Sequence, residues 1–495
     1  MERYDIVIIG GGPAGYAAAM RGLDLGKKVC LIEKDKIGGA AIYNGALSSK
    51  TLWEIANKVN DINVFPHSQQ TEPYKMKWED VRTALNEAIF ERKMQYSCQI
   101  NLLNSEHHAY FHYEKGEGSF LSCNEVQIKQ GAETKVIWGD FIFIATGSRP
   151  AVPSNILADE KYIYTSDGID HITDYPKSIV IVGGGVIGCE YATIFANFGQ
   201  TKVYLIDRQE RILPSEDEDI STLVSKNLEK KGVVIHHKAS LKRIEVKDGE
   251  VEYEITQPNG ESEIIRVEKA FLAVGRIPNH EVLNIDKAGI HMSKRGYHIG
   301  DLNTQTNIPN IYAIGDVSGR ITLVNMAEIE GRYAVEKAFN ITSTPLNYDN
   351  ICTIMFLNPE VGCVGVNEQH CLAHNIPVKV VKIDYSLIAR AIAMRKTEGF
   401  FKIIVTNDDE MKILGMRAVG EHASSAIQAV GLLIKMNEGI EHLSELVHPH
   451  PSIVEGIQEC VRMLLNKSIF KSSILKDKLA CYRLVDGKKE AIERL

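Results

Sequence analysis

Short apolar runs recur along the first 320 residues, and a glycine-rich turn and a helical stretch follow two of them. Runs of four or five mostly apolar residues predict short buried strands. The strands predicted in this way are residues 5–9, 29–32, 141–144, 178–182, 202–206 and 311–314. Because strands and helices alternate, the pattern predicts an α/β fold.

Two more helices are predicted in the first 110 residues. One begins near Ser49, with Ser48 or Ser49 as its N-cap, since a serine hydroxyl can accept a hydrogen bond from the free amides at a helix start. The polar segment 60–77 contains two prolines and predicts a loop. Apolar residues then recur at helical spacing over 81–89, which predicts an amphipathic helix.

The pattern changes beyond about residue 347. Segments 400–405 and 412–419 have the character of antiparallel strands, with helices between them. This part is therefore predicted to be an α+β domain. The last segment, 471–495, is charged and carries no motif, and we assign it no structure from sequence.

Glycines follow the first predicted strand. Gly10, Gly12 and Gly15 have the spacing GxGxxG between a strand and a helix, which is typical of a turn that binds a dinucleotide pyrophosphate. The free amides and the dipole at the helix N-terminus favour such an anion. The next strand ends at Glu33, where a carboxylate can accept hydrogen bonds from ribose hydroxyls.

A second turn of the same kind follows the strand at 178–182. Gly183, Gly185 and Gly188 repeat the spacing, and the next strand ends at Asp207. Two tight turns without ligands are the alternative interpretation, but two complete strand–turn–helix–strand–acid units are hard to explain by chance. The sequence therefore predicts two dinucleotide sites.

Composition and charge exclude several classes of function. The 495 residues are long enough for about three domains, and 44% hydrophobic and 24% charged residues are ordinary for a globular protein. A net charge of -8 without a basic run argues against nucleic-acid binding, and no run of about 18 apolar residues predicts a membrane span. The chain enters a strand directly after Met1, which leaves no room for a signal peptide, so we expect a cytoplasmic location.

Neither the cysteines nor the acidic residues predict a metal site. The nine cysteines are scattered singly, without CxxC or a Cys/His ligand spacing. Residues 216–219 are all acidic and suggest a cation site, but carboxylates in the first turn of a helix are explained more simply by the helix dipole.

The segment 38–50, GGAAIYNGALSSK, and the two glycine turns together give the chain a family resemblance. It resembles the FAD-dependent pyridine nucleotide-disulfide oxidoreductases, which include dihydrolipoamide dehydrogenase, glutathione reductase and the soluble pyridine nucleotide transhydrogenases. In that family this segment normally carries two redox cysteines five positions apart. The matching positions in this chain are Ala41 and Ala46. The resemblance extends from residue 4 to about residue 470.

The resemblance implies a fold of two Rossmann-type dinucleotide-binding domains plus an α+β C-terminal dimerisation domain. It implies an FAD-binding domain at 1–150 and 277–346, an NAD(P)-binding domain at 151–276, a dimerisation domain at 347–470 and a tail at 471–495. The implied cofactors are FAD and NAD(P)H. The implied partners are a small-molecule electron acceptor and a second copy of the chain, with no nucleic acid and no membrane.

The same resemblance implies particular site residues. Lys50 and Glu190 match an ion pair beside the flavin, and His450 and Glu455 match a catalytic dyad, which leaves His448 as an extra histidine. The implied cofactor-binding residues are Gly10, Gly12, Gly15, Glu33, Gly39, Lys50, Thr146, Gly147, Gly315 and Asp316, together with Gly183, Gly185, Gly188, Asp207, Arg208 and Gly275.

The missing cysteines direct the functional prediction. Alanine has no nucleophile, so lipoamide or glutathione disulfide chemistry is not expected. The predicted function is an NAD(P)H oxidoreductase that passes hydride to FAD and from there directly to an acceptor. It is most similar to a soluble transhydrogenase, whose usual sequence after the second turn resembles residues 185–192, GVIGCEYA.

Two alternatives remain open from sequence. One is an NAD(P)H:quinone reductase, and the other is a flavoprotein that has lost catalysis and serves as a binding module. His450 could protonate a quinone oxygen or only pack the dimer interface, and the sequence favours neither role. For the nucleotide, Asp207 favours the ribose 2′-hydroxyl of NADH, whereas Arg208 allows some use of NADPH.

Overall fold

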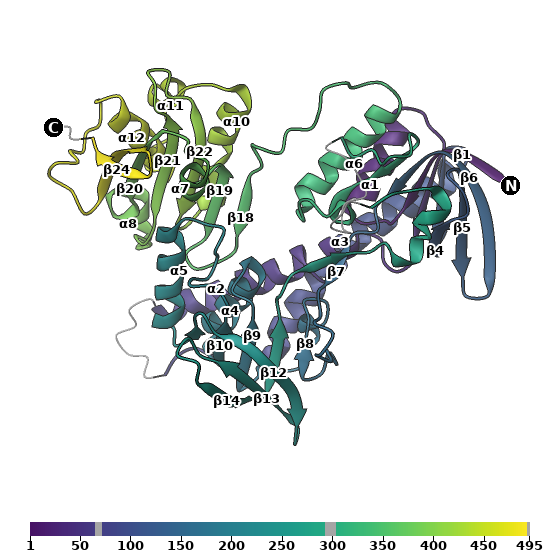
Figure 1. Cartoon of the computed structure of the whole chain (residues 1–495), viewed down its shortest axis with the longest axis horizontal. Helices are drawn as coiled ribbons and strands as arrows, with labels where there is room; N and C mark the ends of the chain where they lie inside the picture. Colours follow the sequence, from purple (N-terminus) through teal and green to yellow (C-terminus); the bar gives the residue numbers. More distant parts are fainter. Residues whose placement is uncertain (65–71, 293–302, 493–495) are drawn as a thin grey trace. The chain divides into compact units, whose positions relative to one another are not determined.

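A computed structural model describes residues 1–64, 72–292 and 303–492 of the chain (Figure 1). The chain forms two compact units. Unit 1 comprises Met1–Val182, Lys242–Glu254 and Ile264–Leu346, and unit 2 comprises Gly183–Leu241, Ile255–Glu263 and Asn347–Leu495.

The first part of unit 1 is built on a seven-stranded sheet in the order β3-β2-β1-β6-β5-β4, with β17 also pairing with β6. Strand β1 pairs in parallel with β2 and β6, whereas β5 pairs antiparallel with β6 and β4. The strands are β1 (Glu2–Ile9), β2 (Val29–Glu33), β3 (Phe111–Lys115), β4 (Glu117–Phe120), β5 (Glu125–Gln130), β6 (Glu133–Ile144) and β17 (Ile311–Ala313).

Apolar side chains cover both faces of this sheet, as the uninterrupted apolar runs predict. Ile6 and Ile8 belong to the core on the side of helices α1 (Pro13–Asp24) and α6 (Val324–Ala338), whereas Val7 and Ile9 belong to the core on the other side. Helices α1 and α6 approach closely at Gly331, where an added Cβ would lie 2.3 Å from the carbonyl oxygen of Ala14. The close helix contact therefore requires glycine at this position.

Two further helices belong to unit 1, α2 (Ala46–Val64) and α3 (Trp78–Glu106). The helix predicted over 81–89 lies within α3, and Val81 and Leu85 are buried as expected. The predictions for α2 are wrong at both ends. It begins before Ser48 and Ser49, whose hydroxyls donate back to the carbonyl of Gly45 instead of capping the helix, and it continues to Val64 across the start of the predicted loop. In this continuation Asn60 is buried, whereas residues 61–64 are exposed; the centre of that loop, 65–71, lies outside the described residues.

The remaining strands of unit 1 are mostly short, although residues 240–241, 255–256 and 262–263 at the ends of β12, β13 and β14 belong to unit 2. Strands β8 and β9 both pair in parallel with β15, β7 pairs antiparallel with β16, and β12, β13 and β14 form a separate sheet. Their bounds are β7 (Ser148–Pro150), β8 (Ile163–Tyr164), β9 (Ser178–Val182), β12 (Ser240–Lys247), β13 (Glu250–Thr256), β14 (Ser262–Val267), β15 (Lys269–Leu272) and β16 (Arg276–Pro278). The 3-10 helices are η1 (Gly39–Ala41), η2 (Ile169–His171), η3 (Glu281–Leu283), η4 (Ile285–Ala288) and η5 (Gly315–Ser318).

Unit 2 begins with the second glycine turn. Helix α4 (Val186–Phe198) follows the turn, strand β10 (Lys202–Ile206) pairs in parallel with β11 (Val234–His236), and helix α5 (Glu218–Lys230) connects these two strands. The strand predicted at 202–206 therefore matches β10 at both ends. The same unit also contains the C-terminal domain.

The C-terminal domain contains a seven-stranded antiparallel sheet in the order β18-β19-β22-β21-β20-β23-β24. The tail that carried no sequence motif supplies the last two strands. The strands are β18 (Thr353–Met355), β19 (Val361–Gly365), β20 (Val378–Asp384), β21 (Phe400–Thr406), β22 (Ile413–Val419), β23 (Leu479–Val485) and β24 (Lys488–Ala491). The helices are α7 (Glu368–Ala373), η6 (Tyr385–Leu387), α8 (Ala389–Met394), α9 (Ala423–Ala426), α10 (Gln428–Met436), α11 (Glu441–Ser444) and α12 (Glu455–Leu464).

The two faces of this sheet differ in chemistry. Phe401 and Ile403 lie on one face and belong to a core that includes residues of α9, α10 and α12. On the other face, Lys382 lies opposite Lys402, and Lys402 lies opposite Arg417. Three basic side chains therefore form a row across β20, β21 and β22, which we call the basic row.

Candidate functional site

The first glycine turn and Glu33 form one constellation in unit 1. Gly10 has a left-handed φ of 113°, and Gly12 caps helix α1 without a side-chain hydrogen bond. An added Cβ at Gly12 would meet nothing within 4 Å, so the backbone faces open space there. Glu33 is buried, and its Oε2 accepts a hydrogen bond from the amide of Gly11 at 2.7 Å while Oε1 accepts one from Asp35 at 2.7 Å.

The segment that carries Ala41 and Ala46 is attached to this turn. The amide of Gly38 donates to the carbonyl of Gly11 at 2.8 Å, and an added Cβ at Gly39 would lie 3.3 Å from the Cα of Gly12. Ala41 ends η1, and Ala46 begins α2. The two alanines thus lie in the segment that directly follows the attached residues Gly38 and Gly39.

Asp316 lies in unit 1 at the second residue of η5. Gly315, which precedes it, has a φ of 72°, and its amide donates to the buried Oε2 of Glu330 at 2.6 Å. The hydroxyl of Ser148 donates to Oδ2 of Asp316 at 2.6 Å. The backbone and the carboxylate of Asp316 are therefore each held by another element.

The turn at residues 145–147 is tied to the segment after β16. Thr146 donates from its hydroxyl to the carbonyl of Asn279 at 2.5 Å and accepts the amide of that side chain at 3.0 Å. Gly147 has a φ of 67°, and its carbonyl accepts the Asn279 backbone amide at 3.0 Å. Gly275, with a φ of 119°, accepts the amide of Ala151 at 2.9 Å.

The second glycine turn repeats the arrangement of the first. Gly183 has a φ of 110°, and Gly185 caps α4 without a side-chain hydrogen bond and faces open space. Oδ2 of Asp207 accepts a hydrogen bond from the amide of Gly184 at 2.6 Å, and Oδ1 accepts one from Gln209 at 2.6 Å. Both oxygens are thus oriented by backbone amides.

The two arginines after Asp207 differ in their surroundings. Arg208 is exposed. Arg211 is half-buried; it donates to the carbonyl of Glu216 at 2.6 Å and to the side chain of Gln369 in α7. The guanidinium of Arg211 therefore holds the loop against the C-terminal domain. Arg208 is the arginine of this pair that faces solvent beside Asp207.

Lys50 and Glu190 lie in different units, and their pairing stays a prediction. Lys50 lies in α2 and donates to the hydroxyl of Ser49 at 3.3 Å. Glu190 lies in α4, is 4% exposed, and accepts the amide of Phe356 at 3.0 Å. A buried carboxylate bonded to a backbone amide is held in one orientation.

His450 and Glu455 form the predicted pair. Nδ1 of His450 lies 2.8 Å from Oε1 of Glu455, and the other carboxylate oxygen accepts the amide of Ser452 at 2.8 Å. Burial acts to raise the pKa of Glu455, but the hydrogen bonds from Ser452 and His450 outweigh it and lower the pKa. The His450 side chain is 71% exposed, so the carboxylate orients an imidazole that faces outward. Burial lowers the pKa of the neighbouring His448, which favours its neutral form.

The nine cysteines all lie in the described part of the chain. All nine are free, and six of them are buried. Burial raises the pKa of the Cys30 and Cys189 thiols, the two that lie in the elements beside the glycine turns, and so disfavours the nucleophilic thiolate. Over the described ranges, no three His, Cys, Asp or Glu side chains gather as a metal site.

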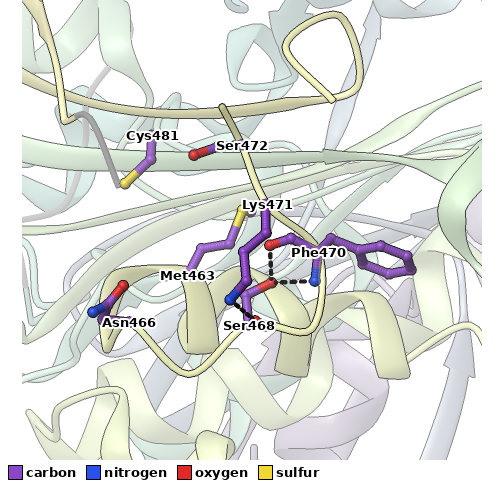
Figure 2. Close-up of a pocket in the computed structure, with 7 residues that line it drawn as sticks. All are labelled: Met463, Asn466, Ser468, Phe470, Lys471, Ser472 and Cys481. Carbon is purple, nitrogen blue, oxygen red and sulfur yellow. Dashed lines mark hydrogen bonds between the residues drawn. The ribbon is translucent and has the colours of Figure 1, made fainter. Parts of the chain in front are cut away.

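A small pocket occurs in the C-terminal domain (Figure 2). Lys471 donates across it to the carbonyl of Ser468 at 2.9 Å. None of its lining residues is a predicted site residue, so the pocket is separate from the constellations above. The lining residues are Met463, Asn466, Ser468, Phe470, Lys471, Ser472 and Cys481.

The acidic run at 216–219 contacts the basic row of the C-terminal sheet. Glu216 pairs with Arg417 at 2.8 Å. Lys402 is 1% exposed and pairs with Asp217 at 3.0 Å, with Asp219 at 2.8 Å and with Glu368 at 2.6 Å. Glu218 and Asp219 do lie in the first turn of α5, as the dipole interpretation requires, but sequence reasoning missed the basic partners of the run.

Sequence reasoning also missed Ser148, Arg276 and Asn279. Each lies inside or beside a motif that the sequence analysis quotes, but its partner is more than 120 positions away. No local signal in the sequence pairs them.

Two family models match the chain. The model of the pyridine nucleotide-disulphide oxidoreductases matches residues 4–331, and the model of their dimerisation domain matches residues 351–461. The chain belongs to the pyridine nucleotide-disulphide oxidoreductase family.

Relatives in this family match nearly the whole chain. Dihydrolipoyl dehydrogenase of Geobacillus stearothermophilus is 31% identical over 470 residues, which cover 94% of this chain and 97% of the relative. Dihydrolipoyl dehydrogenase of Chlamydia trachomatis is 32% identical over 467 residues, covering 92% and 95%.

Solved structures of the family have the same fold. The Cu(II) complex of RclA, an HOCl-induced flavoprotein disulfide reductase from Escherichia coli, matches with a TM-score of 0.83 and 26% identity, covering 94% of this chain and 100% of that one. LpdA from Mycobacterium tuberculosis, at 23% identity and a TM-score of 0.85, shows the likeness of fold alone. The predicted α/β fold with a dinucleotide-binding region and a C-terminal dimerisation domain is confirmed.

The residues of both glycine turns fit the dinucleotides that this family uses. The third glycine of each turn, Gly12 or Gly185, begins a helix without a side-chain cap and faces open space. Beside each turn, one carboxylate accepts hydrogen bonds from two backbone amides. Such a turn suits a pyrophosphate, and such an acid suits a ribose.

In the described part of the chain, no helix is long and apolar enough to cross a membrane.

Proposed function

We propose that this family member is an FAD-dependent NAD(P)H oxidoreductase that passes reducing equivalents directly to a small-molecule acceptor, without a redox disulfide. In this it would act most like a soluble pyridine nucleotide transhydrogenase. The observation that carries the proposal is the presence of Ala41 and Ala46 in the segment attached to the first glycine turn, in a chain that keeps both dinucleotide turns.

The chain's own residues would bind and orient two dinucleotides. The turn at Gly10–Gly15 with Glu33 and Asp316 would hold FAD, and the turn at Gly183–Gly188 with Asp207 would hold the nicotinamide nucleotide. A bound flavin supplies a centre that accepts and donates electrons in pairs. Lys50 and Glu190 would be the charged groups beside that centre.

Disulfide exchange needs a thiolate that attacks a substrate disulfide and a second thiol that completes the exchange. Ala41 and Ala46 cannot supply either group. The buried thiols Cys30 and Cys189 are poor nucleophiles because burial raises their pKa. We therefore expect no lipoamide or glutathione disulfide reductase activity, although named relatives are dihydrolipoyl dehydrogenases.

One observation favours a second candidate, an NAD(P)H:quinone reductase. His450 is exposed and oriented by Glu455 at 2.8 Å, which is the arrangement of a general acid that can protonate an acceptor oxygen. His450→Ala would then leave the rate at which NADH reduces the flavin unchanged, and would slow reoxidation of the flavin by a quinone at least tenfold. A change of less than twofold would leave His450 with a packing role only.

The proposal is tested by three assays on the purified, yellow holoprotein. NADH added anaerobically should bleach the flavin band quickly, a thio-nicotinamide analogue should then be reduced at the expense of NADH, and dihydrolipoamide should give no NADH. Dihydrolipoamide oxidation that persists after each cysteine is changed to serine would refute the thiol argument. A flavin that NADH does not bleach would instead support the binding-module alternative.

The dimerisation domain supports a homodimer. In this domain the side chains of Leu432 and Met436 on α10 are each 57% exposed, and that of Val447 is 92% exposed beside the His450 loop. Large apolar side chains in a dimerisation domain are the groups that a second copy would cover.

A further inference from the structure

Asp316 is held by a chain of two side chains from the crossing strands of unit 1. Ser148 begins β7, and its hydroxyl lies 2.6 Å from Oδ2 of Asp316. Arg276 begins β16, and its Nε lies 2.7 Å from the same hydroxyl and 4.0 Å from Oδ2. Three segments that are far apart in the sequence therefore meet at one carboxylate oxygen.

The direction of each hydrogen bond follows from the chemistry of the groups. A guanidinium can only donate, so the Ser148 oxygen must accept from Arg276. The single hydroxyl hydrogen is then available for Asp316, and the carboxylate accepts it. Polarised in this way, the hydroxyl is a stronger donor than an isolated serine.

Arg276 is itself fixed by several oxygens. Its Nη2 donates to the carbonyl of Ser148 at 2.8 Å, and its Nη1 lies 3.3 Å from the hydroxyl of Ser166. Its side chain is only 15% exposed. A mostly buried arginine that donates from all three nitrogens has little freedom, so it holds Ser148 in one rotamer.

The contacts of Asp316 are one-sided. Among the described residues, the side-chain contacts of Asp316 with Ser148 and Arg276 both involve Oδ2. Its backbone is fixed separately, because the amide of Gly315 donates to the buried Glu330. The contacts to Oδ2 and to the backbone therefore fix the orientation of the carboxylate, and with it the direction of Oδ1, although neither Ser148 nor Arg276 contacts Oδ1.

The neighbouring Arg149 has other partners. It makes two hydrogen bonds to Glu281, at 2.6 and 3.1 Å, and both side chains are about half exposed. It also donates to Oδ1 of Asn279 at 3.0 Å and to the carbonyl of Pro278 at 3.3 Å. Since these partners do not include Ser148 or Asp316, Arg149 serves as a control for the loss of a guanidinium from the same pair of strands.

We propose that Ser148 and Arg276 are positioning residues that hold Oδ2 of Asp316, so that Oδ1 is presented to a hydroxyl of bound FAD. This inference rests on the proposed function, which assigns Asp316 to the flavin nucleotide. It adds that FAD binding depends on Ser148 and Arg276, and that these two residues act on FAD only through Asp316.

A double-mutant cycle on the holoprotein tests this dependence. The dissociation constant of FAD is measured from the rise in flavin fluorescence on dilution, and the visible circular dichroism of the bound flavin is recorded in parallel. Ser148→Ala is expected to raise the dissociation constant about tenfold, and Asp316→Ala is expected to raise it further. In the Asp316→Ala background, Ser148→Ala should add less than threefold.

Conservative variants separate positioning from folding. Ser148→Thr keeps the hydroxyl and should restore both FAD affinity and the circular dichroism spectrum. Arg276→Lys keeps the charge but loses the fork, and should change the spectrum and weaken FAD several-fold. Arg149→Gln should leave both readouts within twofold of the wild type.

The outcomes distinguish the two levels of the argument. The positioning role is wrong if Ser148→Ala raises the dissociation constant of FAD by the same factor with and without Asp316, or does not raise it in the wild type. The proposed function stands in either case. If Asp316→Ala leaves FAD binding unchanged, the assignment of Asp316 and the positioning role fail together. If the wild type binds no FAD, the proposed function itself fails.

Discussion

Glu33 and Asp207 stand in the same relation to their glycine turns. Each carboxylate accepts the amide of the second glycine of its turn, at 2.7 Å for Glu33 and 2.6 Å for Asp207, and each accepts the amide of the residue two positions further along the chain with its other oxygen. The carboxylates are therefore oriented before any ribose arrives. Since a preorganised group loses little freedom on binding, we propose that both carboxylates favour a ribose.

The first prediction concerns the choice of nicotinamide nucleotide. We expect kcat/KM for flavin reduction to favour NADH over NADPH by about tenfold, equivalent to about 1.4 kcal/mol. In the proposed site Asp207 would repel a 2′-phosphate and Arg208 would partly offset this repulsion, whereas Arg211 is engaged with Glu216 and Gln369. Asp207→Ala should therefore move the ratio towards NADPH, and Arg208→Gln should move it towards NADH.

Arg211→Gln is the control for that prediction, because its guanidinium faces the C-terminal domain. It should leave the NADH to NADPH ratio unchanged. A wild type that prefers NADPH, or a ratio that does not respond to Asp207→Ala, would show that the carboxylate does not select the nucleotide.

The second prediction concerns the buried ion cluster. Lys402→Met should lower the free energy of unfolding by about 3–5 kcal/mol, because it leaves Asp217, Asp219 and Glu368 without their shared buried cation. Lys230→Met is the matched control, since that side chain is 70% exposed and lies 3.5 Å from Glu398. It should cost less than about 1 kcal/mol. If urea unfolding showed the same loss of unfolding free energy in both variants, the stabilising role of the cluster would be contradicted.

The third prediction is a loss of stability in acid from the same cluster. Burial opposes ionisation of Asp219 and Glu368, but the charge and hydrogen bond of Lys402 outweigh it together with those of further partners, Lys382 for Asp219 and Lys489 for Glu368. The pKa of each carboxyl therefore lies below its ordinary value of 3.8 or 4.5. A lowered pKa contributes stability that is fully present above the ordinary value and is lost as the pH falls through the folded value. Stability should therefore fall below about pH 4 more steeply in the wild type than in Lys402→Met. Parallel pH profiles of Tm would rule out this origin.

The fourth prediction concerns the subunit contact. Val447→Asp places a charge on a side chain that is 92% exposed in the single chain and that we expect a second copy to cover. It should shift the dimer towards monomers in sedimentation velocity at micromolar concentration. Ile264→Asp, at a 57% exposed position on β14 of unit 1, should leave the dimer intact. A wild type that sediments as a fully active monomer would contradict the homodimer.

Local features of the fold were predictable from sequence. The strands at β1, β2, β9 and β10 and both glycine turns were predictable because each depends on a short run of neighbouring residues. The start of α2 was not, since the hydroxyls of Ser48 and Ser49 have two local uses, capping a helix or bonding back to a carbonyl within it, and the sequence does not choose between them.

Pairings between distant residues could not be predicted. Ser148 and Asp316 are 168 positions apart, and Asp217 and Lys402 are 185 apart. Each pair depends on how whole sheets and loops fold together. From sequence, the acidic run at 216–219 therefore suggested a cation site or, more simply, a helix start, whereas the structure gives three of its four acids a basic partner on one face of the C-terminal sheet.

The most direct test of the central claim is an anaerobic titration of the holoprotein with NADH, followed at the flavin band. A centre with flavin alone takes up about two electrons, whereas flavin plus a redox disulfide takes up about four. We predict complete bleaching at about one NADH per flavin, and the same end point in a variant in which all nine cysteines are changed to serine. An end point near two NADH per flavin that falls to one in the cysteine-free variant would reveal a working disulfide and contradict the account.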